Sequence, residues 1–268
     1  MAPIKKLLFA FIIALTVPVS ASAADYSHYL RHIPPPENFG QVVLDNYSNE
    51  AGVLPVTFDH WLHRAKFTCR VCHIDIGFAM KAEMTEISAA DNMSGYYCGA
   101  CHDGKRVFEG RNIFGSCAEN YTEDEGKRCA RCHSSAEAEE RKYDYKSFSA
   151  ELPKLPGNLI DWVKAESEGK IKLTDFLEGV SYKREPLKAQ DDFSIKIRSW
   201  DVLFSHRKHT VWNGCELCHP MIFPSTKRGA TKYSMFQIMM KGEYCGVCHI
   251  SVAFPVWLCD KCHTTLVE

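Results

Sequence analysis

Apolar residues gather in a run at residues 7–19, close to the start of the chain. Lys5 and Lys6 precede this run, and the small-residue sequence Ala-Ser-Ala follows it at 21–23. A charged start, a short apolar run and small residues at the end are typical of a secretory signal peptide, so we predict a cleaved segment at residues 1–23. The run is too short for a stable bilayer crossing, and no other stretch reaches about 18 apolar residues, so we expect no integral membrane span.

Two later stretches have the pattern of a strand. Residues 191–204 alternate apolar and polar positions at Phe193, Ile195 and Ile197, which predicts a strand. Residues 52–58 (GVLPVTF) are also apolar and extended in character. Both stretches lead into a segment that contains two histidines.

A helix is predicted in the middle of the chain. The segment LPKLPGNLIDWVKAESEGK at 152–170 indicates a turn and then a helix, with Asn158 as the N-cap and Gly169 at the end. One edge of this helix is apolar and contains Leu159, Trp162 and Val163. We expect this edge to pack against a cofactor or a neighbouring unit of the chain.

Composition and charge argue against a nucleic-acid-binding protein and against a fold held together by disulfides. The 268 residues carry a formal net charge of −1, which becomes −3 without Lys5 and Lys6 of the predicted signal peptide. This balance gives no bulk attraction to a polyanion, so we expect no nucleic-acid partner. A cysteine-rich exported chain suggests disulfides, but there are 13 cysteines and twelve of them form Cys-x-x-Cys pairs. Pairs this close would not link distant parts of a fold.

Each of the six Cys-x-x-Cys pairs is followed at once by a histidine. Cys-x-x-Cys-His is the attachment signature of c-type haem: two thiols bind the vinyl groups on one edge of the porphyrin, and the histidine is the proximal iron ligand. Zinc also binds Cys-x-x-Cys pairs, but it does not require the histidine. We therefore predict six covalently attached haem c groups. Their attachment residues are Cys69, Cys72 and His73; Cys98, Cys101 and His102; Cys129, Cys132 and His133; Cys215, Cys218 and His219; Cys245, Cys248 and His249; and Cys259, Cys262 and His263.

Four of the remaining six histidines form two His-x-x-His pairs, His60 with His63 and His206 with His209. In each pair, the second histidine stands six residues before the first cysteine of a motif. Positions i and i+3 share a face of a helix, so the two rings can diverge towards two different irons. Solvated surface histidines are the alternative, and the repeated spacing argues against it.

The order Phe-x-His-x-x-His, followed by three Cys-x-x-Cys-His motifs, resembles the trihaem cytochromes c7, relatives of the tetrahaem cytochromes c3. The resemblance covers about 54–135 and about 200–268. In that family the first histidine of the pair ligates the first haem, and the second ligates the middle haem. The resemblance therefore implies four ligand pairs: His60 with His73, His63 with His102, His206 with His219, and His209 with His249.

The His-x-x-His pairs provide no distal ligand for the third haem of each unit. In c7 proteins its distal ligand often comes from just before the second motif, and there this chain has Met93 and Met240, each five residues before a motif cysteine. Thioether sulfur is a known axial ligand of c-type haem, whereas methionine as a flexible core residue is the alternative. The rival methionines are Met239, then Met84 and Met235. His28 and His32 are the competing source of ligands, for this chain or a neighbouring molecule, and surface histidines are their alternative.

The two haem-binding stretches form an internal repeat. The histidine pairs and first motifs align at an offset of 146, the second motifs at 147 and the third motifs at 130. The first unit therefore contains an insertion of 17 residues within 110–126, predicted as a surface loop. The insertion contains the odd cysteine, Cys117, which we interpret as a tolerated free thiol. A reactive thiol, an intermolecular disulfide and a haem ligand are the alternatives.

The predicted organisation is a signal peptide at 1–23, an N-terminal segment at 24–53, a first trihaem unit at 54–135, a connecting segment with the short helix at 136–198, and a second trihaem unit at 199–268. About 41 residues per haem remain after cleavage, too few for a large protein-only core. We expect a c3/c7-like multihaem fold, mostly coil with short α-helices wrapped around haems and small two-stranded β elements. Without haem, such a chain should fold poorly.

Irons with two protein ligands have no open position for a substrate, so the pattern favours an electron carrier over an enzyme. We expect a periplasmic protein that passes electrons from a quinol oxidase or another cytochrome to an acceptor further out; association with the outer membrane or the cell exterior is a further possibility. The resemblance implies anaerobic respiration on metals or other extracellular acceptors. One alternative is a multihaem reductase with an open haem, if Met93 or Met240 does not bind. Another is a homo-oligomeric cytochrome filament, in which His28 or His32 ligates a neighbour's haem.

Overall fold

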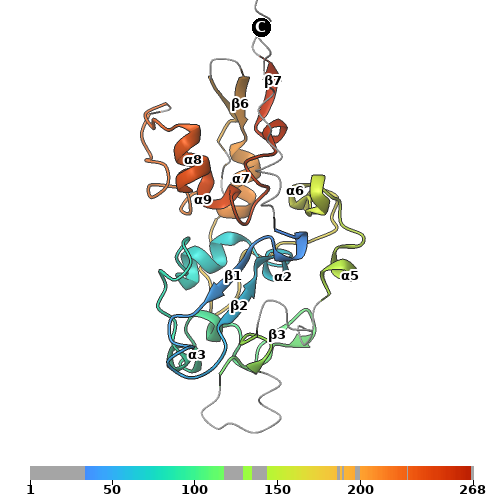
Figure 1. The fold of residues 1–268 in the computed structure, drawn as a ribbon, viewed down its shortest axis with the longest axis vertical. Coiled ribbons are helices and arrows are strands. Elements are labelled where there is room, and N and C mark those ends of the chain that lie inside the picture. The colour runs from blue at the N-terminus through green and yellow to red at the C-terminus, as the bar shows by residue number, and fades with distance from the viewer. Residues whose placement is uncertain are drawn as a thin grey trace, which may run out of the picture. The chain divides into compact units, whose positions relative to one another are not determined.

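The computed structural model describes residues 34–117, 129–134, 144–185, 188, 190–196, 200–227 and 229–266. Within these ranges the chain is mostly turn and coil, interrupted by short helices and strands (Figure 1). This is the fold class expected from the sequence. The predicted signal peptide, His28 and His32 lie outside the described residues, as do residues 118–128 of the predicted insertion.

The α-helices are α2 (His60–Arg64), α3 (Ala89–Met93), α5 (Tyr145–Ser149), α6 (Trp162–Ser167), α7 (His206–Asn213), α8 (Met235–Lys241) and α9 (Gly246–His249). The strands are β1 (Gln41–Leu44), β2 (Val56–Asp59), β3 (Val107–Phe108), β4 (Arg111–Asn112), β5 (Phe193–Ile195), β6 (Trp200–Phe204) and β7 (His263–Leu266). Single helical turns are η1 (Pro36–Asn38), η3 (Tyr97–Ala100), η4 (Pro156–Asn158) and η5 (Cys259–Lys261), and η2 (Val71–Ile76) is a wider π-type turn.

Antiparallel strands precede both histidine pairs, as the sequence predicts. β1 pairs with β2, with Val42 opposite Phe58, and β5 pairs with β6, with Ile195 opposite Val202. The second sheet differs from the expected two strands because β7 joins it on the other side of β6. In the first unit, β1 comes from the segment that the sequence places before the unit.

The third attachment motif of each unit is hydrogen-bonded to the strand that precedes the histidine pair. In the first unit, the Thr57 N–H donates to the Cys132 carbonyl at 2.9 Å, and the Thr57 hydroxyl donates to the Ser134 carbonyl at 2.7 Å. In the second unit, the Leu203 N–H donates to the Cys262 carbonyl at 3.3 Å. Each unit is therefore closed by backbone hydrogen bonds between its first and last parts.

The predicted helix of the connecting segment is present as α6, but the prediction of Asn158 as its N-cap is wrong. Asp161 is the cap: its side chain accepts a hydrogen bond from the N–H three residues further on, at 3.1 Å. Ile160 forms an antiparallel bridge with Lys154, which delays the helix start. Gly169 follows the helix end with a φ of 68°, as a helix-terminating glycine does.

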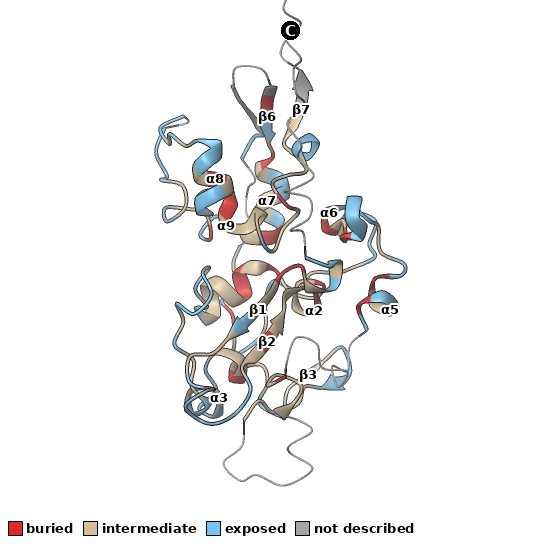
Figure 2. Ribbon diagram, in the orientation of Figure 1, coloured by how far each residue is buried: buried red, intermediate tan, exposed pale blue. Residues whose placement is uncertain are grey.

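Buried apolar residues form two small clusters, both of which include the connecting segment. The first contains Trp61, Ala65, Tyr145, Ile160, Trp162 and Trp212. The second contains Phe39, Leu155 and Leu159, with Phe254, Trp257 and Leu258 packed against it. Figure 2 shows how short and scattered the buried stretches are. The apolar edge predicted for the connecting helix therefore packs against both units, through Trp162 and Leu159.

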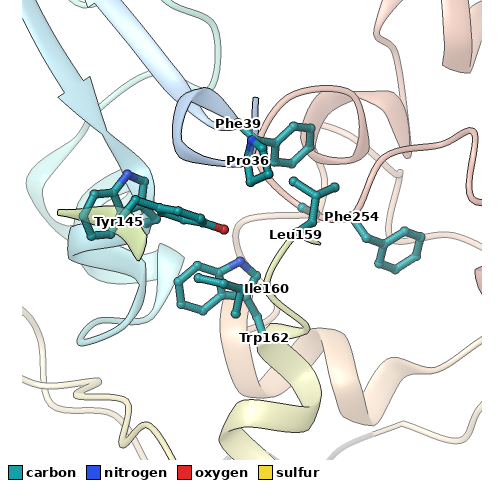
Figure 3. Close-up of a pocket in the computed structure, with 9 residues that line it drawn as sticks. Pro36, Phe39, Tyr145, Leu159, Ile160, Trp162 and Phe254 are labelled. Carbon is teal, nitrogen blue, oxygen red and sulfur yellow. The ribbon is translucent and has the colours of Figure 1, made fainter. Parts of the chain in front are cut away.

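An apolar pocket lies where the two clusters meet. Its lining includes Pro36, Phe39, Tyr145, Trp162 and Phe254, and Figure 3 shows these rings gathered around Leu159 and Ile160. Trp61 of the first unit also lines the pocket, which therefore combines residues from the N-terminal segment, the first unit, the connecting segment and the second unit. None of the helices in the described part of the chain has the length and apolarity that a bilayer crossing requires.

Candidate functional site

Three of the four predicted ligand pairs face each other across a nearly constant gap. The ring centres of His60 and His73 lie 6.4 Å apart, and the two rings are almost parallel, at 7°. The rings of His63 and His102 lie 6.1 Å apart. Metal–imidazole bonds are about 2 Å long, so two rings that share a six-coordinate metal have centres roughly 6 Å apart. The gap therefore fits one iron.

The second unit repeats this arrangement in part. The ring centres of His209 and His249 lie 6.1 Å apart at 62°, which closely matches the 60° of the corresponding pair in the first unit. His206 and His219 are not in ring contact in the described structure, so this pair is not brought together.

In eight candidate ligands a hydrogen bond engages Nδ1 of the ring and leaves Nε2 available for a metal. In each of them, Nδ1 lies 2.5–3.3 Å from a backbone carbonyl oxygen. These eight are His60, His73, His102, His133, His206, His209, His219 and His249. An Nδ1–H that donates to a carbonyl fixes the tautomer in which Nε2 has a free lone pair, and this is the usual second contact of a metal-bound histidine.

Burial keeps the facing imidazoles neutral. It lowers the pKa of His60 to about 4, of His63 to about 3 and of His249 to about 4. Nearby histidines lower these values further, whereas hydrogen bonds with backbone groups raise them. A neutral imidazole is the form that binds a metal, so these side chains are ready for an iron at neutral pH.

The motif phenylalanines explain why Phe-x-His-x-x-His recurs. The ring of Phe58 lies 4.9 Å from that of His60, nearly perpendicular at 86°, and 4.6 Å from that of His63, at 33°. Phe204 does the same in the second unit, with centre distances of 5.0 Å to His206 and 4.4 Å to His209. One aromatic ring thus supports both imidazoles of a pair. The sequence pattern contains this phenylalanine in both units but does not indicate its role.

A glycine lets the helix before each second motif approach it closely. A Cβ built on Gly99 would lie 1.8 Å from the Asn92 carbonyl oxygen, and one on Gly246 would lie 2.1 Å from that of Ile238. Tyr97 and Tyr244, each directly before a second motif, have φ values of 46° and 52°. The second motifs are therefore structural repeats as well as sequence repeats.

The predicted methionine ligands lie in these helices. Met93 is the last residue of α3 and is 43% exposed, and Met240 in α8 is 63% exposed. Met239, the nearest rival, is half-buried. Met84 and Met235 are both exposed. Met93 and Met240 stay predicted ligands of the third haems.

In the part of the chain that the structure describes, the cysteines form neither disulfides nor a cluster of the zinc-binding kind. All 13 lie in described residues and none is paired with another. In the part of the chain that the structure describes, no group of three or more His, Cys, Asp or Glu side chains could hold a metal ion, whereas a zinc site needs three or four protein ligands. Burial raises the pKa of Cys117, and the nearby Cys129 raises it further.

Comparison with known proteins identifies the family. The sequence profile described as "Cytochrome c7 and related cytochrome c" matches residues 56–134 and 202–265, together more than half of the chain. The chain belongs to this family. It is a multihaem c-type cytochrome with covalently attached haem c, about six groups by its six attachment motifs. When attached, these groups supply one-electron exchange at their irons.

The sequence is also similar to chains of solved structures. The C-terminal hexahaem fragment of GSU1996 is 25% identical, over 87% of this chain and 100% of that chain, with a TM-score of 0.26. Its N-terminal hexahaem fragment is 22% identical, over 84% and 98%, with a TM-score of 0.24. The dodecahaem cytochrome c GSU1996 is 22% identical, over 85% and 75%, with a TM-score of 0.27. No curated protein matches the chain.

Proposed function

We propose that this electron-transfer protein is an exported, periplasmic hexahaem carrier. It takes electrons from a quinol oxidase or another cytochrome and passes them outward, in anaerobic respiration on metals or other extracellular acceptors. The apolar run at residues 7–19 and the requirement of c-type haem for attachment outside the cytoplasm support export. Membership of the cytochrome c7 family supports the carrier role.

The carrier assignment depends most on the facing histidines. The imidazoles that face each other at 6.1–6.4 Å would hold one haem iron between them and leave no open position for a substrate. The chemistry that the bound haem would supply there is electron exchange. We propose His60 and His63 in the first unit, and His206 and His209 in the second, as the distal ligands of the first and second haems.

The third haem of each unit has His133 or His263 as its proximal ligand, and we propose Met93 and Met240 as the distal ones. Low-temperature magnetic circular dichroism of the oxidised protein counts these ligand sets. The expected result is four bis-histidine haems and two histidine–methionine haems. Six bis-histidine haems would assign His28 and His32 instead. An open haem that binds cyanide or nitrite would contradict the pure carrier role and favour a reductase.

The location and the respiratory role have separate tests. Cell fractionation should recover the protein, without residues 1–23, in the periplasmic fraction; a cytoplasmic protein with an intact N-terminus would contradict export. Deletion of the gene should slow growth on an extracellular metal acceptor and leave growth on a soluble acceptor unchanged. Equal growth of both strains on the metal would contradict the proposed pathway.

A further inference from the structure

The first attachment motifs of the two units face each other. Arg70 lies inside the first motif of unit one, and its side chain is only 3% exposed. It packs against Gly214, the residue directly before the first motif of unit two: a Cβ on Gly214 would lie 2.9 Å from the Arg70 Cδ. Two haem-attachment peptides, 146 residues apart in the sequence, are therefore in contact.

One arginine of the connecting segment binds both peptides. Arg184 donates through both terminal nitrogens to the carboxylate of Asp75, at 2.6 and 2.9 Å, and through Nε to Glu216 at 3.0 Å. Asp75 lies two residues after His73, and its side chain is completely buried. Glu216 lies between the two cysteines of the opposite motif. A planar guanidinium suits this two-sided contact, because its donors have a fixed fork geometry.

A second arginine joins the same elements on another side of the junction. Arg64 directly follows the first histidine pair, and its guanidinium lies 4.9 Å from the ring centre of Trp162 and 5.1 Å from that of Trp212. It also donates to the carbonyl of Val252 at 2.5 Å. Trp162 belongs to the connecting segment and the other two partners belong to unit two, so Arg64 holds all three parts together.

The connecting segment runs along the first motif instead of looping away from it. The Thr68 N–H donates to the Thr174 carbonyl at 3.1 Å, and the Thr174 N–H donates to the Lys66 carbonyl at 2.7 Å. Asp175 accepts from the Thr68 hydroxyl at 2.9 Å and forms an ion pair with Arg70. The segment is therefore part of the junction.

We propose that Arg184 is a positioning residue that holds the attachment peptides at Cys69–Cys72 and Cys215–Cys218 face to face, so that the six haems form one continuous relay rather than two separate triads. Exchange across this junction moves a single electron from a ferrous to a ferric iron, with no bond made or broken. The inference rests on the proposed electron-carrier function and adds the connection between its two halves.

The test compares Arg184→Gln with Lys183→Gln in the full, haem-loaded protein. Both variants remove one positive charge from adjacent positions, and Lys183 is exposed. Haems that are close in space give a split Soret circular dichroism signal. Arg184→Gln should lose part of this splitting and increase the radius of gyration measured by small-angle X-ray scattering, whereas Lys183→Gln should change neither. Arg184→Lys should lie between, because an ammonium cannot form the bidentate contact.

An Arg184→Gln protein with six haems and an unchanged Soret splitting and radius would overturn the proposal. If that variant does not assemble, the unmodified protein is decisive: nuclear Overhauser contacts should link the cysteine-bearing edges of the haems at Cys69–Cys72 and Cys215–Cys218, and their absence would overturn it as well. A cytoplasmic location or an unexpected ligand count would refute the proposed function but leave the difference between Arg184→Gln and Lys183→Gln intact. The two failures are therefore distinguishable.

Discussion

Replacement of Gly99 by alanine tests whether the close approach of α3 to the second motif is required. The new Cβ would lie 1.8 Å from the Asn92 oxygen and 2.7 Å from its carbonyl carbon. Non-bonded heavy atoms pack at about 3.5 Å, so α3 or the motif would have to move by roughly 1.5 Å. The obstructing atoms are backbone atoms of a capped helix, in which Ser88 and Asp91 exchange hydrogen bonds of 3.0 and 3.1 Å. A rotamer change therefore cannot relieve the contact.

Overpacking of this kind costs about 1–3 kcal/mol. For a protein of this size the melting temperature of the haem-loaded Gly99→Ala variant should fall by roughly 2–12 °C, measured by circular dichroism with haem content determined in parallel. Gly115→Ala is the matched control, because a Cβ there meets nothing closer than 3.7 Å. A Gly99→Ala protein that has the same melting temperature as the control and carries six haems would refute the steric argument.

Three further outcomes are expected. Phe58→Leu and Phe204→Leu should each add a high-spin component to the magnetic circular dichroism spectrum, because both histidines of a pair lose their supporting ring; an unchanged spectrum would contradict this role. Asp161→Ala should destabilise the protein by about 1 kcal/mol and Asp161→Asn much less, since asparagine also caps helices; equal melting of both variants would exclude the cap. Burial raises the pKa of Tyr145 from 10 to about 12, so the folded state keeps the phenol proton up to a higher pH than the unfolded state does. The free energy of unfolding should therefore fall as pH rises from 10 to 12, and less steeply in Tyr145→Phe; identical slopes would oppose this.

The six attachment motifs could be recognised in the sequence because covalent haem attachment requires fixed local spacing, and three of the four histidine pairs that the family resemblance implies face each other in the structure. The Cys-x-x-Cys-His motifs are contiguous, and the two histidine pairs stand at a constant distance from them. The strand around Phe193 was also predictable, since alternating apolar positions are a local signal. These features depend on neighbours within a few residues.

The missed features depend on contacts that no local sequence pattern reveals. Asn158 has the composition of an N-cap, but the bridge between Lys154 and Ile160 moves the helix start to Asp161. The contact between Arg184 and Asp75 spans 109 residues, and an isolated arginine in a polar stretch gives no sign of it. Gly99 was visible as part of a repeated motif, but its need for close backbone approach follows only from the position of α3.

The return of the third motif to the strand before the histidine pair has a consequence for the order of assembly. Thr57 cannot complete its hydrogen bonds until Cys132 and Ser134 have emerged, and the second unit likewise waits for Cys262. Contacts so distant in sequence form late, because the intervening chain must first be ordered. During that interval the thiols remain accessible to the attachment machinery, whereas in the closed fold only Cys215 and Cys259 of the 13 cysteines are exposed. The topology thus gives haem attachment a period in which to occur before each unit closes around its cofactors.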